Sequence, residues 1–259
     1  MDLGIAGRRA LVCASSQGLG LACAIALARE GCAVTLNGRD AGRLERARQE
    51  VQAAAGASAS AIAADLDTEA GRATLLAACP EADILVTNNA GPPPGALADW
   101  DHAAWLAALE SNLLSAVLII RALVPGMRAR RFGRIVNITS AMVKSPRPHM
   151  ALSTTARAGL TAFCKSLSLE VAADNVTLNN LLPERIDTPR QEFMARRMMQ
   201  AQGITREEAR ARIAQTIAAR RMGTPAEFGD ACAFLCSAQA GFISGQNLQL
   251  DGGSYPGLI

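Results

Sequence analysis

Two serines and an arginine near the middle of this chain, Ser140, Ser153 and Arg157, are residues that could act on a substrate oxygen. A serine hydroxyl is shorter and much less acidic than a tyrosine phenol, whose pKa is about 10. Arginine keeps its proton and cannot relay one. The only tyrosine, Tyr255, stands four residues from the end of the chain. Any proton transfer in this protein therefore needs an unusual route.

Three proton donors remain open from the sequence. His149 comes four residues before Ser153 and is also explained as a solvent-facing loop histidine. A water held by Ser140 and Ser153 is the second candidate. The third is Tyr255, if the end of the chain reaches the site of a neighbouring subunit.

The elements that must position these residues follow a regular alternation. Short apolar runs are separated by stretches with helical spacing, which predicts a doubly wound parallel sheet. We expect one α/β domain with a Rossmann fold over 1–259, whose ligands lie outside the carboxyl ends of the strands. The apolar runs cover 9–13, 33–37, 60–64, 84–87, 134–139 and 176–182.

Composition narrows the protein class. The chain has 259 residues, 50% of them hydrophobic, and no segment rich in proline, glycine and serine divides it into domains. No apolar run of 18 or more and no signal-peptide pattern is found, so we expect a cytoplasmic protein without membrane association. Seven cysteines without a C-x-x-C pair fit a reducing compartment, and two histidines make a metal site unexpected. A net charge of +3 and 3% aromatic residues do not favour nucleic-acid binding.

The first strand runs into a turn of small residues that precedes a helical stretch. Small side chains let a turn and a helix N-terminus approach a pyrophosphate, whose charge backbone N–H groups and the helix dipole stabilise. An ordinary tight turn is the alternative. The candidate contacts in this turn are Ser15, Ser16, Gly18, Leu19 and Gly20.

Six motifs in order resemble the short-chain dehydrogenase/reductase family over 7–253, and 3-oxoacyl-acyl-carrier-protein reductases are the most similar members. Residues 13–20 resemble T-G-x-x-x-G-x-G, with Ala14 at the first glycine, and 88–91 match N-N-A-G without a substitution. The family's Tyr-x-x-x-Lys is replaced by Ser153-x-x-x-Arg157. The other matching segments are 134–140, 158–160, 179–188 and 251–253.

This resemblance implies a nicotinamide cofactor and assigns residues to it. Gly38 stands where members that use NAD carry an aspartate, and Arg39 where members that use NADP place an arginine, so NADP is favoured over NAD. A solvent-facing arginine is the alternative for Arg39. Asp65 and Leu66 would contact the adenine, although Asp65 equally suits a cap for a helix beginning near Thr68.

The remaining cofactor residues are also implied by the resemblance. Asn89, Ala90 and Gly91 would line the ribose, and Pro183, Ile186 and Thr188 the nicotinamide. Glu184 replaces a glycine of the family. We expect it to bring a carboxylate near the nicotinamide and to be unsuited to a positive φ there.

The catalytic set implied by the resemblance is Ser140, Ser153, Arg157 and Asn112, the last as the holder of a water or as an ordinary helix polar residue. Helices at about 188–222 would cover the substrate. Arginines there either meet a substrate phosphate or carboxylate or form a solvated face. The segment 243–250 resembles a strand at the subunit interface, so a homodimer or homotetramer is expected.

Three function classes follow. The first is an NADP-dependent oxidoreductase that acts on the carbonyl or hydroxyl group of a small molecule, acyl thioesters included, with an altered proton donor. The second is a cofactor-binding protein without turnover, in a sensor or interaction role. The third is a non-redox enzyme on the same scaffold.

Overall fold

A parallel sheet forms the central layer of the molecule. The computed structural model describes residues 2–56 and 58–258. Its seven strands are all parallel and lie in the order β3-β2-β1-β4-β5-β6-β7, which confirms the predicted doubly wound α/β fold. The strands are β1 Arg9–Val12, β2 Ala33–Gly38, β3 Ala59–Ala63, β4 Ile84–Thr87, β5 Gly133–Ile138, β6 Val176–Pro183 and β7 Asn247–Leu250.

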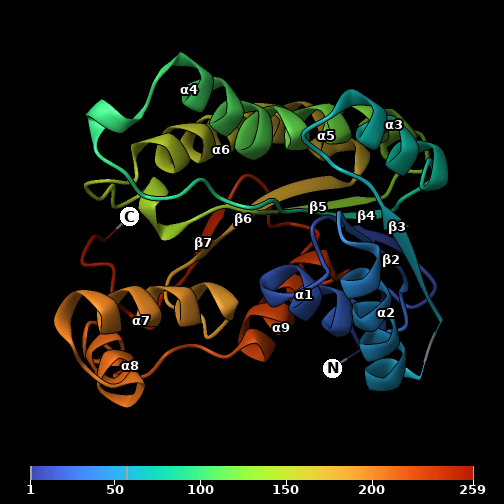
Figure 1. Ribbon diagram of the computed structural model, residues 1–259. Coiled ribbons are helices and arrows are strands. Elements are labelled where there is room, and N and C mark those ends of the chain that lie inside the picture. The colour runs from blue at the N-terminus through green and yellow to red at the C-terminus, as the bar shows by residue number, and fades with distance from the viewer. Residues whose placement is uncertain (1, 57, 259) are drawn as a thin grey trace.

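Helices cover both faces of this sheet (Figure 1). One face carries α1 Gly18–Arg29, α2 Ala41–Ala55 and α9 Pro225–Cys236. The other carries α3 Glu69–Ala78, α4 His102–Leu109, α5 Ser115–Ala129 and α6 Ala151–Val171. Each face buries its own apolar cluster, so the sheet is hydrophobic on both sides.

A helix pair projects from the layer that holds α1 (Figure 1). It consists of α7 Pro189–Gln202 and α8 Arg206–Gln215, which share a small core of Ala195, Ala209 and Ile213. A capping box at Thr205 begins α8, and another at Thr224 begins α9.

A line of polar side chains crosses the sheet from β4 to β7. Thr87 Oγ1 donates to Asn137 Oδ1 at 2.6 Å, and Asn137 Nδ2 donates to Asn180 Oδ1 at 3.1 Å. Asn180 Nδ2 in turn donates to Asn247 Oδ1 at 2.8 Å. A slip of one strand would move these partners apart and break the bonds. Since buried polar groups are costly when unpaired, the bonds help to fix the register of the strands.

The connection between β4 and β5 contains a long apolar helical segment, His102–Ala129. By length and composition it could cross a membrane, and 33% of its most apolar window is buried. A core helix of a water-soluble protein passes the same test, and α5 packs against α3, α6 and the sheet here. Inside the segment, Glu110–Leu114 forms a turn of π-helix, a local feature that frequently marks functional sites.

Candidate active site

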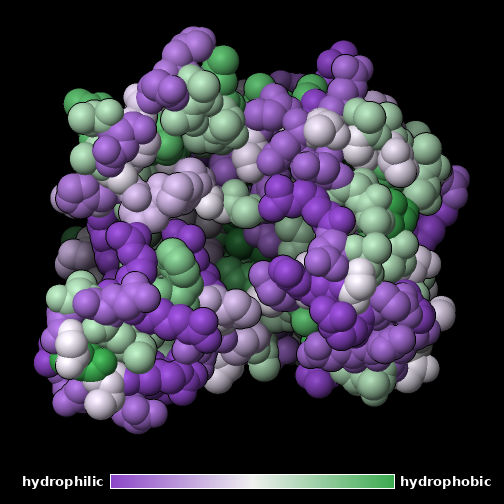
Figure 2. Space-filling view, viewed as in Figure 1, coloured by the Kyte–Doolittle hydropathy of each residue, from purple (hydrophilic) through white to green (hydrophobic). Residues whose placement is uncertain are grey.

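Two adjoining clefts open above the carboxyl ends of the strands, and the space-filling view shows the hollow between the two helical layers (Figure 2). Each has a volume of about 410 Å³. The first cleft lies over β1, β2 and β3 and is lined by 14, 16–19, 37–40, 43, 64–66, 88–90 and 188–190. The second cleft lies over β5 and β6 and is lined by 19, 91, 92, 94, 139, 140, 142, 147, 148, 150, 153, 157, 183–186, 188, 190, 191 and 194.

The turn between β1 and α1 is shaped to admit an anion. Gly18 has φ +63°, and a side chain at Gly20 would lie 2.5 Å from the carbonyl oxygen of Ala14. The N-cap residue Gln17 makes no side-chain hydrogen bond to the start of α1. The backbone N–H groups of this helix end are therefore open to a ligand, and the turn fits a pyrophosphate.

Ala14, which stands at the family's first glycine, has φ +43°. Its N–H donates to Asn37 Oδ1 at 3.2 Å, and its carbonyl accepts from Asn88 Nδ2 at 3.1 Å. Asn37 Nδ2 also donates to the carbonyls of Ile62 and Ala64, so this side chain joins the ends of β1, β2 and β3. Sequence reasoning missed both structural roles, although each asparagine follows apolar strand residues.

We expect Ala14→Gly to raise the free energy of unfolding by about 0.5–1 kcal/mol. A left-handed backbone conformation costs an alanine about 1–2 kcal/mol, and glycine removes this cost. Part of the gain is cancelled because glycine raises the conformational entropy of the unfolded chain. Urea unfolding measures the change. The matched control is Ala53→Gly on the exposed side of α2, which should lose up to about 1 kcal/mol. Equal losses in both variants would contradict the strain at Ala14.

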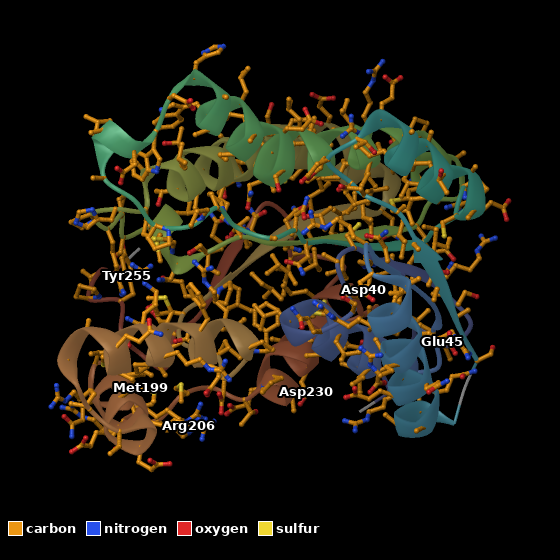
Figure 3. The ribbon with its side chains drawn as sticks, viewed as in Figure 1. Asp40, Glu45, Met199, Arg206, Asp230 and Tyr255 are labelled. Carbon is orange, nitrogen blue, oxygen red and sulfur yellow. The ribbon has the colours of Figure 1, made fainter. Side chains whose placement is uncertain are left out.

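Two arginines stand at the end of the first cleft nearest α2. Arg39 is exposed and has no ion pair among the residues that the structure describes. Asp40, labelled in Figure 3, caps α2 by accepting the Arg43 N–H at 2.8 Å, and that bond is the main cause of its lowered pKa. A side chain at Gly38 would meet Ser16 at 3.2 Å. This end of the cleft therefore presents Arg39 and Arg43 to a ligand, and Arg43 was not predicted.

Between these arginines and the second cleft, the wall comes from β3 and β4. Asp65 and Leu66 line the first cleft. Asp65 accepts the Asp67 N–H at 3.1 Å, whereas Thr68 caps α3, so capping does not explain Asp65. Asn89 Nδ2 donates to Asp67 Oδ1 at 2.8 Å and to the carbonyl of Ser111 at 3.1 Å. The backbone of the 88–91 segment is thereby held beside the cleft.

Arg157 is a buried cation at the base of the second cleft. Its Nη1 donates to the carbonyl of Ile138 at 2.8 Å, and its Nη2 donates to the carbonyl of Asn89 at 3.4 Å. Burial and, to a smaller extent, the charge of Arg190 lower the pKa of Arg157 to about 10. No acid pairs with it among the described residues, so its charge faces the cleft uncompensated.

The two serines lie in the same cleft, and both accept hydrogen bonds. Ser153 Oγ accepts from Arg157 Nε at 3.2 Å, and Ser140 Oγ accepts from the Met142 N–H at 3.2 Å. Each hydroxyl proton remains available for a ligand oxygen. A side chain at Gly91 would lie 3.8 Å from Ser153 Oγ, so glycine keeps the approach open. The arrangement can act as a two-donor oxyanion site.

Asn112 lies behind Arg157 on the π-helical turn. Its Nδ2 donates to the carbonyl of Ala90 at 3.1 Å, while its buried Oδ1 has no hydrogen-bond partner. A cavity of about 10 Å³ beside it is also lined by Asn88 and Arg157. That space suits one water, which would satisfy the Asn112 oxygen.

Neither predicted side-chain proton donor lines the second cleft of its own chain. His149 is exposed and has φ +65°, and its carbonyl accepts the Gly95 N–H at 3.0 Å. Tyr255 lies on the α7 side of the molecule (Figure 3), where its ring centre is 5.4 Å from the Lys144 ammonium. The role of Tyr255 in a neighbouring subunit stays a prediction.

Glu184 differs from expectation. Positive φ falls on the next residue, Arg185 at +56°, so the predicted backbone conflict at Glu184 is wrong. The Glu184 carboxylate lies on the wall of the second cleft, 3.1 Å from Arg147 Nη1 and 3.2 Å from Arg185 Nε. These two arginines neutralise it, and sequence reasoning assigned a role to neither.

The predicted site residues divide between the clefts. Ser140, Ser153 and Arg157 meet in the second cleft, and Asn112 lies behind it. Ser15 and Gly20 line neither cleft and instead shape the turn, where Ser15 Oγ donates to the Val12 carbonyl at 2.7 Å. The predicted cofactor residues in the first cleft are Ser16, Gly18, Leu19, Arg39, Asp65, Leu66, Asn89, Ala90 and Thr188, and those in the second are Leu19, Gly91, Pro183, Ile186 and Thr188.

Comparisons with known proteins agree with this architecture. A family model described as enoyl-(acyl carrier protein) reductase matches residues 13–255. The NADPH-dependent reductase BacG of Bacillus subtilis is 29% identical over 97% of this chain and 99% of its own. The 3-oxoacyl-[acyl-carrier-protein] reductase FabG of Haemophilus influenzae is 30% identical over 96% of this chain and 98% of its own. The structure of L-sorbose reductase from Gluconobacter frateurii, complexed with NADPH and L-sorbose, has a TM-score of 0.95, 30% identity and full coverage of both chains.

Proposed function

Because this chain belongs to the short-chain dehydrogenase/reductase family, we propose that it is an NADP-dependent oxidoreductase in which two serine hydroxyls replace the tyrosine of the family. Its substrate is a small molecule with a carbonyl or hydroxyl group, and acyl thioesters are candidates. The observation that carries this proposal is the meeting of Ser140, Ser153 and Arg157 in one cleft that adjoins an anion-binding turn.

The cofactor assignment rests on the first cleft. The turn at Gly18 would hold the pyrophosphate, and Arg39 and Arg43 would hold the 2′-phosphate of the adenosine ribose. The residues present fit NADP better than NAD, because the carboxylate that follows β2, Asp40, caps α2 by accepting the Arg43 N–H and also lies 3.9 Å from Arg43 Nη2. NADP supplies the hydride that is exchanged with the substrate carbon.

The protein's own residues polarise the substrate oxygen. Ser140 and Ser153 donate hydrogen bonds to it, and the buried Arg157 charge favours the negative charge that develops there. Neither serine becomes an anion at neutral pH, and Arg157 keeps its proton. A water in the second cleft therefore supplies the proton to the oxygen and leaves hydroxide for solvent to neutralise.

A second candidate function, cofactor binding without turnover, is favoured by one observation. The described lining of the second cleft contains no histidine, cysteine, lysine or tyrosine. It therefore lacks the side chains that most often exchange protons near neutral pH, apart from Glu184, which is paired with two arginines. The two functions separate in one experiment, a search for NADPH oxidation with a panel of ketones and 3-oxoacyl thioesters.

Three further properties stay predictions. We propose that α7 and α8 cover the bound substrate, since Arg190, Gln191 and Met194 of α7 line the second cleft. A homodimer or homotetramer remains the expected assembly, and sedimentation velocity measures it. A cytoplasmic location is expected on the sequence grounds given above.

We expect Arg39→Ala to weaken NADPH binding by about 10- to 100-fold, because a hydrogen bond between two charged groups contributes about 1.5–3 kcal/mol. NADH binding should stay within about twofold, since NADH lacks the 2′-phosphate. Fluorescence titration of the reduced cofactors measures both. Arg29→Ala is the matched control, because Arg29 ends α1 outside the first cleft. Equal weakening of NADH and NADPH would contradict the assignment of Arg39 to the phosphate.

A further inference from the structure

The second cleft concentrates positive charge. Four arginines line it, and Glu184 is the single acid, so the lining carries 4 − 1 = +3. The whole chain of 259 residues also carries a net charge of +3. The cleft is therefore much more basic than the rest of the protein. The four arginines are Arg147, Arg157, Arg185 and Arg190.

One carboxylate is shared by two of these arginines, which leaves their hydrogen-bonding capacity incompletely used. Glu184 Oε1 lies 3.1 Å from Arg147 Nη1 and 3.2 Å from Arg185 Nε. The Arg185 Nε is buried and, although near enough for an ion pair, is not aligned for a hydrogen bond. The Nη1 of Arg185 reaches only Gln191 Oε1, at 3.5 Å. An anion would complete the bonding of this guanidinium.

The backbone at Arg185 supports a functional reason for its position. Arg185 has φ +56°, a conformation that costs a side-chain-bearing residue about 1–2 kcal/mol. Its carbonyl accepts the Gly223 N–H at 3.2 Å, which ties the strained residue to the start of α9. Strain of this kind persists where surrounding contacts impose it and is concentrated at binding and active sites.

Arg190 lies in the first turn of α7 and lines both clefts. Its guanidinium carbon lies 5.6 Å from the centre of the Phe193 ring, and no acid pairs with it among the described residues. Burial, followed by the charge of Arg197, lowers the pKa of Arg190. The N-cap Thr188 makes no side-chain hydrogen bond to α7. An anion here would offset the repulsion between Arg190 and Arg197, and it would accept hydrogen bonds from the uncapped N–H groups at the start of α7.

These contacts lead to a substrate class. We infer that the substrate carries a carboxylate or phosphate group, which Arg185 and Arg190 bind while its carbonyl or hydroxyl oxygen meets Ser140 and Ser153. The second part of this inference rests on the proposed function. The first part does not, because an anion can bind to these arginines without any hydride transfer.

The test is binding to the intact protein, free of cofactor and loaded with NADP⁺, by isothermal titration calorimetry at low salt. Two matched pairs of ketones serve as probes. Acetoacetate and its neutral analogue acetoacetamide represent the carboxylate, and hydroxyacetone phosphate and hydroxyacetone represent the phosphate. We expect one anion at least to bind 10-fold or more tightly than its neutral partner, and the pair with the larger ratio identifies the anionic group.

Variants assign the binding to a residue. Arg185→Gln should reduce the preference for the anion to less than threefold, while Arg185→Lys, which keeps the charge, should retain part of it. Arg212→Gln is the matched control, because it removes an exposed positive charge from α8 outside the cleft and should leave the preference unchanged. Circular dichroism verifies that each variant is folded.

The outcomes are distinct. Equal binding of both members in both pairs, no binding of either anion, or an undiminished preference in folded Arg185→Gln would overturn the inference. A clear preference in a protein that oxidises no NADPH would support anion recognition and contradict only the proposed reductase activity.

Discussion

The double variant Ser153→Tyr, Arg157→Lys should reduce ketones about 10²–10⁴ times faster than the natural chain, measured as kcat. A positioned general acid contributes a factor of this size, and the natural residues at these positions supply none. Ser153 and Arg157 lie four residues apart on α6 and line the same cleft, so a tyrosine and a lysine placed there face the same substrate oxygen. Stopped-flow or steady-state NADPH oxidation measures the rate.

A control and a pH profile separate this gain from a packing effect. Ser153→Phe with Arg157→Lys introduces the ring without its hydroxyl and should gain nothing. In the natural chain the rate should stay constant from about pH 6 to 9, because serine does not ionise there and Arg157, whose pKa burial lowers only to about 10, stays charged. In the tyrosine variant, reduction should decline within that range as the phenol ionises. A rate no higher than that of the phenylalanine control, with NADPH bound, would show that proton donation does not limit the natural chain.

Removal of the Ser140 hydroxyl should lower kcat by about 10²–10³-fold, the usual effect of deleting one donor from an oxyanion site. The hydroxyl accepts the Met142 N–H at 3.2 Å, so its own proton is directed elsewhere. Ser140→Ala should leave NADPH binding unchanged, because Ser140 does not line the first cleft. Parallel titration and turnover measurements test both statements.

Ser145→Ala is the matched control for this variant. Ser145 lies five residues further along the same loop and does not line the second cleft, so its replacement should leave kcat within about twofold. If Ser140→Ala and Ser145→Ala behave alike, Ser140 is not a catalytic residue and the two-donor arrangement is wrong.

The location of the site was predictable because it depends on strand ends. Six apolar runs predicted six of the seven strands to within two residues at each end, and the polar residues that follow them necessarily meet at one edge of a parallel sheet. The seventh strand begins at Asn247, inside the segment that resembled a family strand. Local patterns were sufficient for these features.

Details that depend on contacts between distant segments were not predictable. No local pattern indicates that Glu184 pairs with Arg147, since the two come from different strand-end loops. Positive φ was expected at Glu184, because Glu184 replaces a glycine of the family, but the structure has it at Arg185. The π-helical turn around Asn112 is likewise not predicted, since it covers a single turn and apolar periodicity is recognised only over several turns.

The two asparagines that hold Ala14 have a thermodynamic consequence. Asn37 and Asn88 fix the N–H and the carbonyl of Ala14 through contacts within the protein itself, so the shape of this turn does not depend on a nucleotide. Binding then avoids the entropy loss of ordering a loop, which amounts to about 1–2 kcal/mol per residue. The heat-capacity change on nucleotide binding should accordingly be small and reflect only the surface that the ligand itself covers.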